Sequence, residues 1–228
     1  MPQPKVIVLV LALACLAPVA SAQNFFDNWQ TAIALHVTPV GSIPPAQRCS
    51  PTLRASTLVT QVAGTSQGGN YWWTYLLVCH GSDSTGIGGM EMGIRYPPSI
   101  VIHDWILCAD LQFPDPIWPG SDGSNVLTWT TAHCPRTRSE PLVPRTVIAI
   151  GGYFYMGAYA PSQLFVIPRP VSGLAQVADC QSRVDNDTGK IPSHLSVAGF
   201  GGAAGYNACY QGVPVRSSTW SFIKSSIR

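Results

Sequence analysis

Short apolar segments recur at regular intervals along this chain, and clusters of Gly, Pro, Ser and Asn separate them. No interior segment keeps a helical period of apolar positions, so the pattern favours an antiparallel all-β fold over an alternation of strands and helices. The strands are expected at Thr31–Thr38, Thr57–Ala63, Tyr71–Cys79, Ile87–Tyr96, Ile100–Cys108, Asn125–Thr131, Thr146–Tyr159, Gln163–Ile167, Ala175–Asp179 and Leu195–Phe200.

These strands predict an antiparallel β-sandwich, either Ig-like or jelly-roll-like. Turn-forming residues such as Gly68-Gly69-Asn70 stand where the chain must reverse. One short helix is expected over Trp220–Ser226, near the C-terminal end, with Ser218 or Thr219 as its N-cap. A helix of two turns depends on packing rather than on propensity, so we expect it to lie against a sheet.

A short motif occurs twice. Ile-Gly-Gly, followed by Tyr and then by Pro-Ser, begins at Ile87 and again, with the same internal spacing, at Ile150. Two similar halves would suit a sandwich of two sheets, and a chance recurrence of common β-protein residues is the alternative. The glycines of the motif, together with Gly93, predict bulges or close backbone packing inside strands.

The N-terminal segment has the three parts of an export signal. A basic start precedes the apolar run Val6–Leu13, and the small residues Ala20-Ser21-Ala22 follow it. We therefore expect residues 1–22 to be a signal peptide and residues 23–228 to be one secreted domain. Lipidation of Cys15 is the alternative. The apolar run is shorter than the roughly 20 residues that a membrane-spanning helix needs.

The cysteine count agrees with export. Seven cysteines are present, and six remain after removal of the signal, an even number that predicts disulfides in an oxidising compartment. Local closure favours pairing in sequence order. The predicted pairs are Cys49–Cys79, Cys108–Cys134 and Cys180–Cys209.

Charge excludes several function classes. Only 11% of residues are charged, and the formal net charge is +2. There is no basic run of the kind that nucleic-acid binding requires. After the signal no apolar stretch is long enough to span a membrane. We expect no cofactor.

Several segments resemble a group of uncharacterised secreted bacterial proteins. The resemblance covers roughly residues 75–210 and implies export and a shared fold. It carries no catalytic residue, because that group has no established activity. The matching segments are Gly89–Tyr96, Trp105–Leu111, Val177–Cys180, Ala198–Gly201 and Gly205–Cys209.

Two residues raise the possibility of a hydrolase. Ser66 lies in a Gly-x-Ser-x-Gly pattern, but a strand rather than a helix is expected to follow it, so a turn explains the pattern equally. Glu91 is centred in an apolar strand, and Arg95 lies on the same face of that strand. We predict a buried Glu91–Arg95 ion pair, with no second carboxylate placed opposite it for glycoside hydrolysis.

We predict no metal site. Cys79-His80 and His133-Cys134 combine zinc-ligand types, but neighbouring residues on a strand point to opposite faces. Asp185–Gly189 has the alternating oxygen ligands of a calcium loop but lacks the acidic residue that would complete it. The preferred interpretation is a solvated loop.

The tryptophans give the better functional lead. Trp72 and Trp73 must face opposite sides of a regular strand, so one of them can be exposed. Trp118 lies in the Pro-rich loop Phe113–Ser124, where its ring either stacks on a ligand or folds back over a sheet edge. Trp72 and Trp118 are our candidate ligand-binding residues.

The sequence thus favours a secreted, non-enzymatic binding, adhesion or structural module. Its candidate partners are a carbohydrate or another extracellular protein. The alternative is an extracellular hydrolase acting on polysaccharide or ester bonds.

Overall fold

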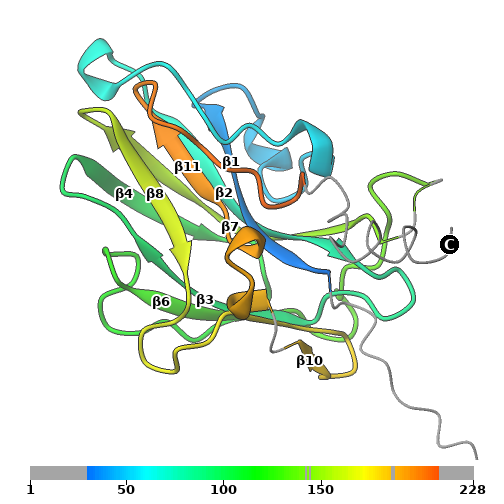
Figure 1. Cartoon of the computed structure of the whole chain (residues 1–228). Helices are drawn as coiled ribbons and strands as arrows, with labels where there is room; N and C mark the ends of the chain where they lie inside the picture. Colours follow the sequence, from blue (N-terminus) through cyan, green and yellow to red (C-terminus); the bar gives the residue numbers. More distant parts are fainter. Residues whose placement is uncertain (1–29, 142, 144, 186–187, 211–228) are drawn as a thin grey trace, which may run out of the picture.

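The structure is a computed structural model that describes residues 30–141, 143, 145–185 and 188–210. It shows an antiparallel sandwich of two β-sheets, whose strands can be followed in Figure 1. Sheet A has four strands in the order β1-β2-β7-β4. These are β1 (Ala32–Pro39), β2 (Trp72–Gly81), β7 (Val147–Ala158) and β4 (Ile100–Leu107).

Sheet B has seven strands, and β3 (Gly89–Arg95) is central to it. On one side β3 pairs with β6, which pairs with β5; on the other it pairs with β9 at one end and with β8 at the other. β10 pairs with β9, and β11 pairs with β8. The bounds are β5 Leu111–Gln112, β6 Ser124–Thr128, β8 Ser162–Ile167, β9 Gln176–Ala178, β10 Val184–Asp185 and β11 Val197–Phe200.

The described helices are single turns of 3-10 helix. They lie in the connections between strands, in agreement with the all-β expectation. Their bounds are Pro45–Gln47, Ala55–Thr57, Ser66–Gly68, Thr188–Lys190 and Pro192–His194.

The repeated Ile-Gly-Gly motif marks the central region of each sheet. One copy leads into β3 of sheet B, and the other lies in β7 of sheet A. In both cases the chain crosses to the other sheet after the Pro-Ser turn, from β3 to β4 and from β7 to β8. β4 then pairs with β7, and β8 pairs with β3. The two copies therefore occupy equivalent places in the fold.

The core lies between the two sheets. Its centre is formed by Met90, Met92 and Phe154, which are at most 2% exposed. Gly152 shows why glycine is needed there, because a Cβ at this position would lie 2.5 Å from the carbonyl oxygen of Ile106. The β2–β7 register shifts at the same point, where Leu76 pairs with Gly152 and Leu77 with Ile150. The predicted bulge is confirmed at this site.

Residues 40–61, which we call the strap, cover part of the outer face of sheet A. Ala55 and Leu58 of the strap are buried in a second apolar cluster together with Trp73, Tyr75 and Tyr153 of the sheet. Outward-pointing residues of β1 and β2 are therefore buried as deeply as inward-pointing ones. This burial explains why these strands read as continuous apolar runs.

All six predicted cysteines form disulfides, but the predicted pairing is wrong. The pairs are Cys49–Cys108, Cys79–Cys209 and Cys134–Cys180. Their partners are 59, 130 and 46 residues apart in sequence. Local closure fails here because segments that lie next to each other in a sandwich are distant along the chain. Three disulfides are consistent with an extracellular protein.

One of the predicted strands is absent from the structure. The segment Thr57–Ala63 forms an isolated bridge between Gln61 and Gly199 instead of a strand, so that prediction is wrong. The two-residue strands β5 and β10 were not predicted. The C-terminal helix over Trp220–Ser226 and the signal peptide lie outside the described residues. In the described part of the chain, no helix has the length and apolarity that crossing a membrane requires.

Candidate functional site

Both predicted ligand-binding tryptophans pack against other aromatic rings of the protein. Trp72 is 3% exposed, and its ring packs in the core at 5.2 Å from that of Phe200. Trp118 folds back from its loop onto Trp105 and Phe154, at centroid distances of 5.2 and 5.6 Å. Of the two alternatives for Trp118, the structure shows the ring packed back on the protein.

Ser66 has a structural role in the described structure. It is 6% exposed, donates a hydrogen bond to the carbonyl of Asn70 at 2.7 Å and accepts one from the amide of Ala158 at 2.8 Å. A 3-10 turn, rather than the helix of a nucleophile elbow, carries it. Both of these hydrogen bonds go to the backbone, so Ser66 gives no support to the hydrolase alternative.

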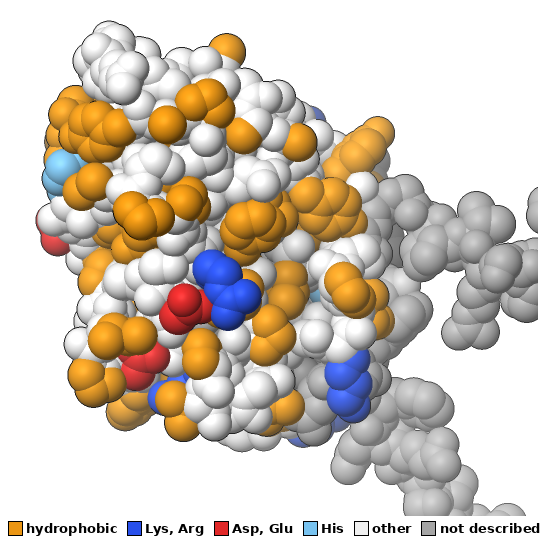
Figure 2. Space-filling view, turned by 60° about the vertical axis from the view of Figure 1, so that its left-hand side comes forward, with side chains coloured by type: hydrophobic (Ala, Val, Ile, Leu, Met, Phe, Trp, Pro, Cys, Tyr) orange, Lys and Arg blue, Asp and Glu red, His pale blue; other side chains and the backbone are white. Residues whose placement is uncertain are grey.

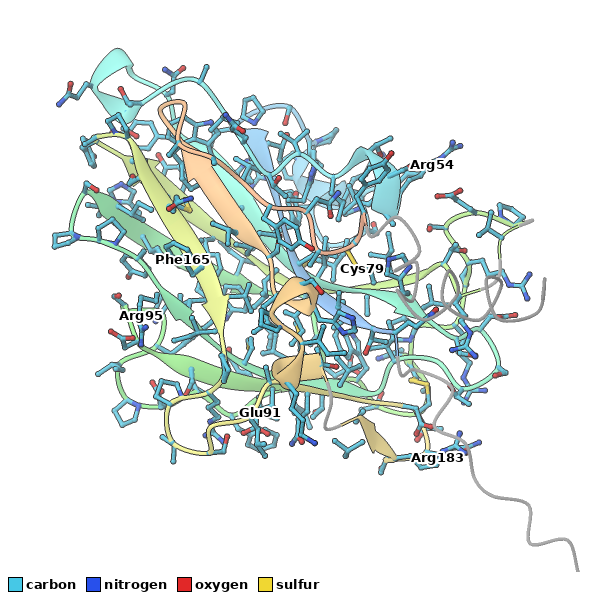
Figure 3. The ribbon with its side chains drawn as sticks, viewed as in Figure 1. Arg54, Cys79, Glu91, Arg95, Phe165 and Arg183 are labelled. Atoms are coloured by element: carbon cyan, nitrogen blue, oxygen red, sulfur yellow. A yellow bond between two sulfur atoms is a disulfide. The ribbon has the colours of Figure 1, made fainter. Side chains whose placement is uncertain are left out.

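Glu91 is buried but does not pair with Arg95, so that prediction is wrong. Arg95 binds Asp122 at 2.6 Å, and Figure 3 shows Arg95 and Glu91 well separated along β3. Glu91 accepts hydrogen bonds from Ser172 at 2.7 Å, from Gln176 at 2.6 Å and from Arg169 at 3.3 Å. Two of these donors come from the β8–β9 loop, which sequence spacing along one strand cannot reveal.

The Cys-His pairs do not form metal sites. Cys79 and Cys134 are in disulfides, and His80 bonds through Nε2 to the carbonyl of Cys209 at 2.7 Å. Asn186 and Asp187 of the suggested calcium loop lie outside the described residues. Among the residues that the structure describes, no three His, Cys, Asp or Glu side chains come together in a metal-binding group.

The outer face of sheet B differs from these buried sites, because its apolar residues are exposed. Strand pairing aligns Leu111 with Thr128, Thr128 with Gly89, Gly89 with Ala178, and Ala178 with Val184. This row crosses five strands and points outward, since its neighbours Met90, Leu127 and Val177 point into the core. Leu111 and Val184, at its two ends, are 53% and 43% exposed. We call the row and its surroundings the sheet B face.

A second outward row runs beside the first. Phe113, which is 56% exposed, exchanges backbone hydrogen bonds with Val126 of β6. Val126 pairs with Glu91, and Glu91 with Gln176. The nearby loops add Ile117 and Val171, which are 56% and 76% exposed. Apolar side chains therefore continue beyond the strands themselves.

The middle of the sheet B face is hollow because its central residues are small. A depression of about 310 Å³ lies there, and its lining includes Gly89, Ala178, Thr128 and Val184. The glycine has no side chain and the alanine has only a methyl group. Val184, at one end of the row, has a longer side chain and borders the depression.

Charge is almost neutralised on this face. The carboxylate of Glu91 is only 8% exposed and has three hydrogen-bond donors, one of them Arg169. Asp179, at the edge of the depression, is 2% exposed and is paired with Arg183 at 2.7 Å. Figure 2 shows another side of the molecule, where charged side chains are also sparse among hydrophobic and uncharged polar ones. The face offers shape and apolar contact rather than charge.

The sequence did not reveal the sheet B face. Leu111 lies between the predicted strand Ile100–Cys108 and the Pro-rich loop Phe113–Ser124, and Phe113 begins that loop. Val184 lies in the connection that follows the predicted strand Ala175–Asp179. The alternation in Asp110-Leu111-Gln112-Phe113 was the available signal, since Leu111 and Phe113 point outward while Gln112 turns inward to accept a hydrogen bond from Trp105.

Comparisons with solved structures find distant similarity to cohesin modules. A cohesin module from a family 33 glycoside hydrolase of Clostridium perfringens aligns with a TM-score of 0.40 and 10% identity, covering 75% of this chain and 97% of that one. A non-cellulosomal cohesin of Archaeoglobus fulgidus aligns with a TM-score of 0.39 and 9% identity, covering 68% and 81%. A cohesin from a type I cohesin–dockerin complex of Clostridium thermocellum gives 0.38 and 9%, covering 68% and 89%.

No model of a known protein family matches the sequence, and no curated protein matches it. With TM-scores of 0.40 or less and identities of about one residue in ten, these similarities carry no site residue across to this chain.

Proposed function

We propose that this protein is an exported, non-catalytic module that binds another protein through the sheet B face. The observation that carries the proposal is the outward row Leu111–Thr128–Gly89–Ala178–Val184, which is uncharged along its whole length and exposed at both ends. Exposed apolar side chains gathered on one face, here Leu111, Phe113 and Val184, are characteristic of interaction sites in soluble proteins.

The partner is a protein with an uncharged contact surface that bears at least one protruding apolar side chain. The depression over Gly89 and Ala178 accepts such a side chain, while Leu111 and Phe113 contact its surroundings. The exposed ends of the row, Leu111 and Val184, are aliphatic. This favours a protein over a sugar, because sugar binding relies on aromatic stacking and many hydrogen bonds. The hydrolase alternative receives no support from Ser66 or Glu91, whose hydrogen bonds are described above.

The test uses affinity capture with the immobilised full chain from the secreted proteins of the source organism. The wild type is compared with the variant Leu111→Ser/Phe113→Ser and with Ala178→Arg, which places a charge in the depression. Val101→Ser is the matched control, since Val101 is also an exposed aliphatic residue, 38% exposed, but lies in β4 of sheet A. We expect one protein that the wild type and control retain and that both face variants lose.

The captured protein is then purified and its affinity measured directly. We expect the face variants to weaken binding at least about tenfold, while the affinity changes less than about twofold between 0.1 and 1 M salt, because charge pairs contribute little. Equal retention by all variants would refute the proposal. Sedimentation of the wild type as a dimer that the face variants abolish would make a second copy of this chain the partner instead.

A further inference from the structure

A second hollow lies away from the sheet B face. It is a groove of about 600 Å³ between residues 49–53 of the strap and the segment 129–139. Ile148 and Ile150 of β7 contribute apolar surface to it, and the Cys49–Cys108 disulfide lies at its edge. Its size is within the range of small-molecule sites. We call it the loop groove.

Trp129 supplies an aromatic surface in the loop groove. The residue is half-buried, packs against the core on one side and lines the groove on the other. Its backbone is fixed by a hydrogen bond from its amide to the carbonyl of Gly88 at 3.0 Å. A tryptophan held in this way keeps its position when a ligand stacks on it, so little conformational entropy is lost on binding.

Asp110 supplies a fixed acceptor in the same groove. One carboxylate oxygen accepts hydrogen bonds from the amide and the hydroxyl of Thr130, both at 2.7 Å, and the other bonds to Nδ1 of His133 at 2.8 Å. These bonds lower the pKa of Asp110 to about 2, so the group is ionised at neutral pH. A carboxylate only accepts hydrogen bonds, so Nδ1 of His133 is the donor in this pair.

The composition of the groove selects a class of ligand. The ionised Asp110 disfavours an anion, and the guanidinium of Arg138, which also lines the groove and pairs with Asp83, disfavours a cation. Ser50, Thr52 and Thr137 add uncharged hydroxyl groups. An aromatic ring, a fixed carboxylate and several hydroxyls together suit a neutral ligand with one apolar face and many hydroxyl groups.

We propose that the loop groove binds a neutral saccharide, with Trp129 stacking on the sugar ring and the Oδ1 atom of Asp110 accepting a hydrogen bond from one of its hydroxyls. The proposal is independent of the protein partner, because the two sites use different residues for their main contacts. Trp129 also borders the depression of the sheet B face, so Asp110 provides the cleaner variant.

The test applies the purified full chain to an array of neutral and acidic glycans and then measures the affinity of the best neutral glycan by calorimetry. Asp110→Asn removes the charge of the acceptor but keeps its size, and Trp129→Ala removes the stacking surface. We expect each variant to weaken binding at least about tenfold. Phe113→Ser, on the sheet B face, is the control and should bind the glycan within about twofold of the wild type.

Thermal unfolding of each variant separates loss of the site from loss of the fold. If Trp129→Ala fails to fold, Trp129→Phe takes its place and should retain partial binding. The proposal is wrong if the wild type binds no neutral glycan at millimolar concentration, if it binds acidic glycans alone, or if folded Asp110→Asn binds as tightly as the wild type. None of these outcomes affects the test of the protein partner.

Discussion

The outer faces of the two sheets are built from similar material and end in different environments. On sheet A, Trp73, Tyr75 and Tyr153 point outward and are 8%, 0% and 5% exposed. On sheet B, Leu111 and Phe113 also point outward, yet more than half of each residue is exposed. Exposure therefore depends on what lies over each face rather than on its own residues.

The two outer faces differ in exposure because the strap covers part of the face of sheet A. Its residues pack on the aromatic side chains of sheet A, and the guanidinium carbon of Arg48 lies 4.6 Å from the ring centre of Trp73. The Cys49–Cys108 disulfide and a hydrogen bond from the amide of Val59 to Nδ1 of His36 hold it in place. Apolar residues that the chain covers itself serve stability, whereas those it leaves open are available to a partner.

The largest loss of stability is expected from removing a buried aromatic side chain on the outer face of sheet A, which the strap covers. Trp73→Ala should lower the free energy of unfolding by about 3–5 kcal/mol, because it removes a large buried side chain and leaves a cavity under the strap. Denaturant unfolding followed by circular dichroism measures the change. A loss below about 1 kcal/mol would show that the strap does not pack on this ring.

Releasing the strap should have the next largest effect. The double variant Cys49→Ser/Cys108→Ser should lose about 2–4 kcal/mol of unfolding free energy. Its total tryptophan fluorescence should become more accessible to a soluble quencher, because Trp73 lies under the strap. The matched control is Cys134→Ser/Cys180→Ser, which also removes a disulfide but leaves the attachment of the strap intact. Equal quenching in both variants would contradict a specific role of the first disulfide.

Lowering the pH should reduce the free energy of unfolding by less than the two preceding changes, through His36 of sheet A. Burial lowers the pKa of His36 to about 4 from an ordinary value of 6.5. The unfolded chain therefore takes up the proton first as the pH falls. The contribution of His36 to the free energy of unfolding is fully present above pH 6.5 and is lost as the pH falls toward 4. The loss between pH 7 and pH 5 is about 2 kcal/mol.

Protonation of His36 would also remove the acceptor that the amide of Val59 uses. His36→Asn keeps an acceptor near that position without titrating in this range. Unfolding curves at pH 7 and pH 5 should therefore show a smaller difference for this variant than for the wild type. An unchanged difference would assign the acid sensitivity to another group.

The smallest effect on stability is expected on the open face. Phe113→Ala should change the free energy of unfolding by less than about 0.5 kcal/mol, because 56% of the residue is already exposed. The same variant should weaken binding of the captured protein partner. A large loss of stability would show that Phe113 belongs to the core, and the contrast between the two faces would disappear.

Sequence reasoning succeeded where a pattern is local. Nine of the predicted strands correspond to strands of the structure, and the glycine bulge at Gly151 was also anticipated. It failed at Thr57–Ala63, whose alternation looks like a strand. This segment belongs largely to the strap and forms an isolated bridge instead of a ladder.

The candidate site was less accessible to prediction. Trp72 and Trp118 were chosen because large aromatic rings are common in binding sites, but both pack inward. Local alternation shows that two neighbouring residues face opposite ways, but it does not show whether another segment covers either face. Trp73 illustrates this point, since the face opposite to Trp72 is also buried.

By itself, the sequence determined the strand periodicity, the low charge and the six cysteines available for disulfides, because each depends on composition or on near neighbours. Only the tertiary structure decided the disulfide pairing, the partners of Glu91 and the choice of sheet A as the covered face. Those features depend on which distant segments meet, as Cys79 and Cys209 do across 130 residues. Strand order and crossovers set such meetings, and a single sequence does not encode them in any local pattern.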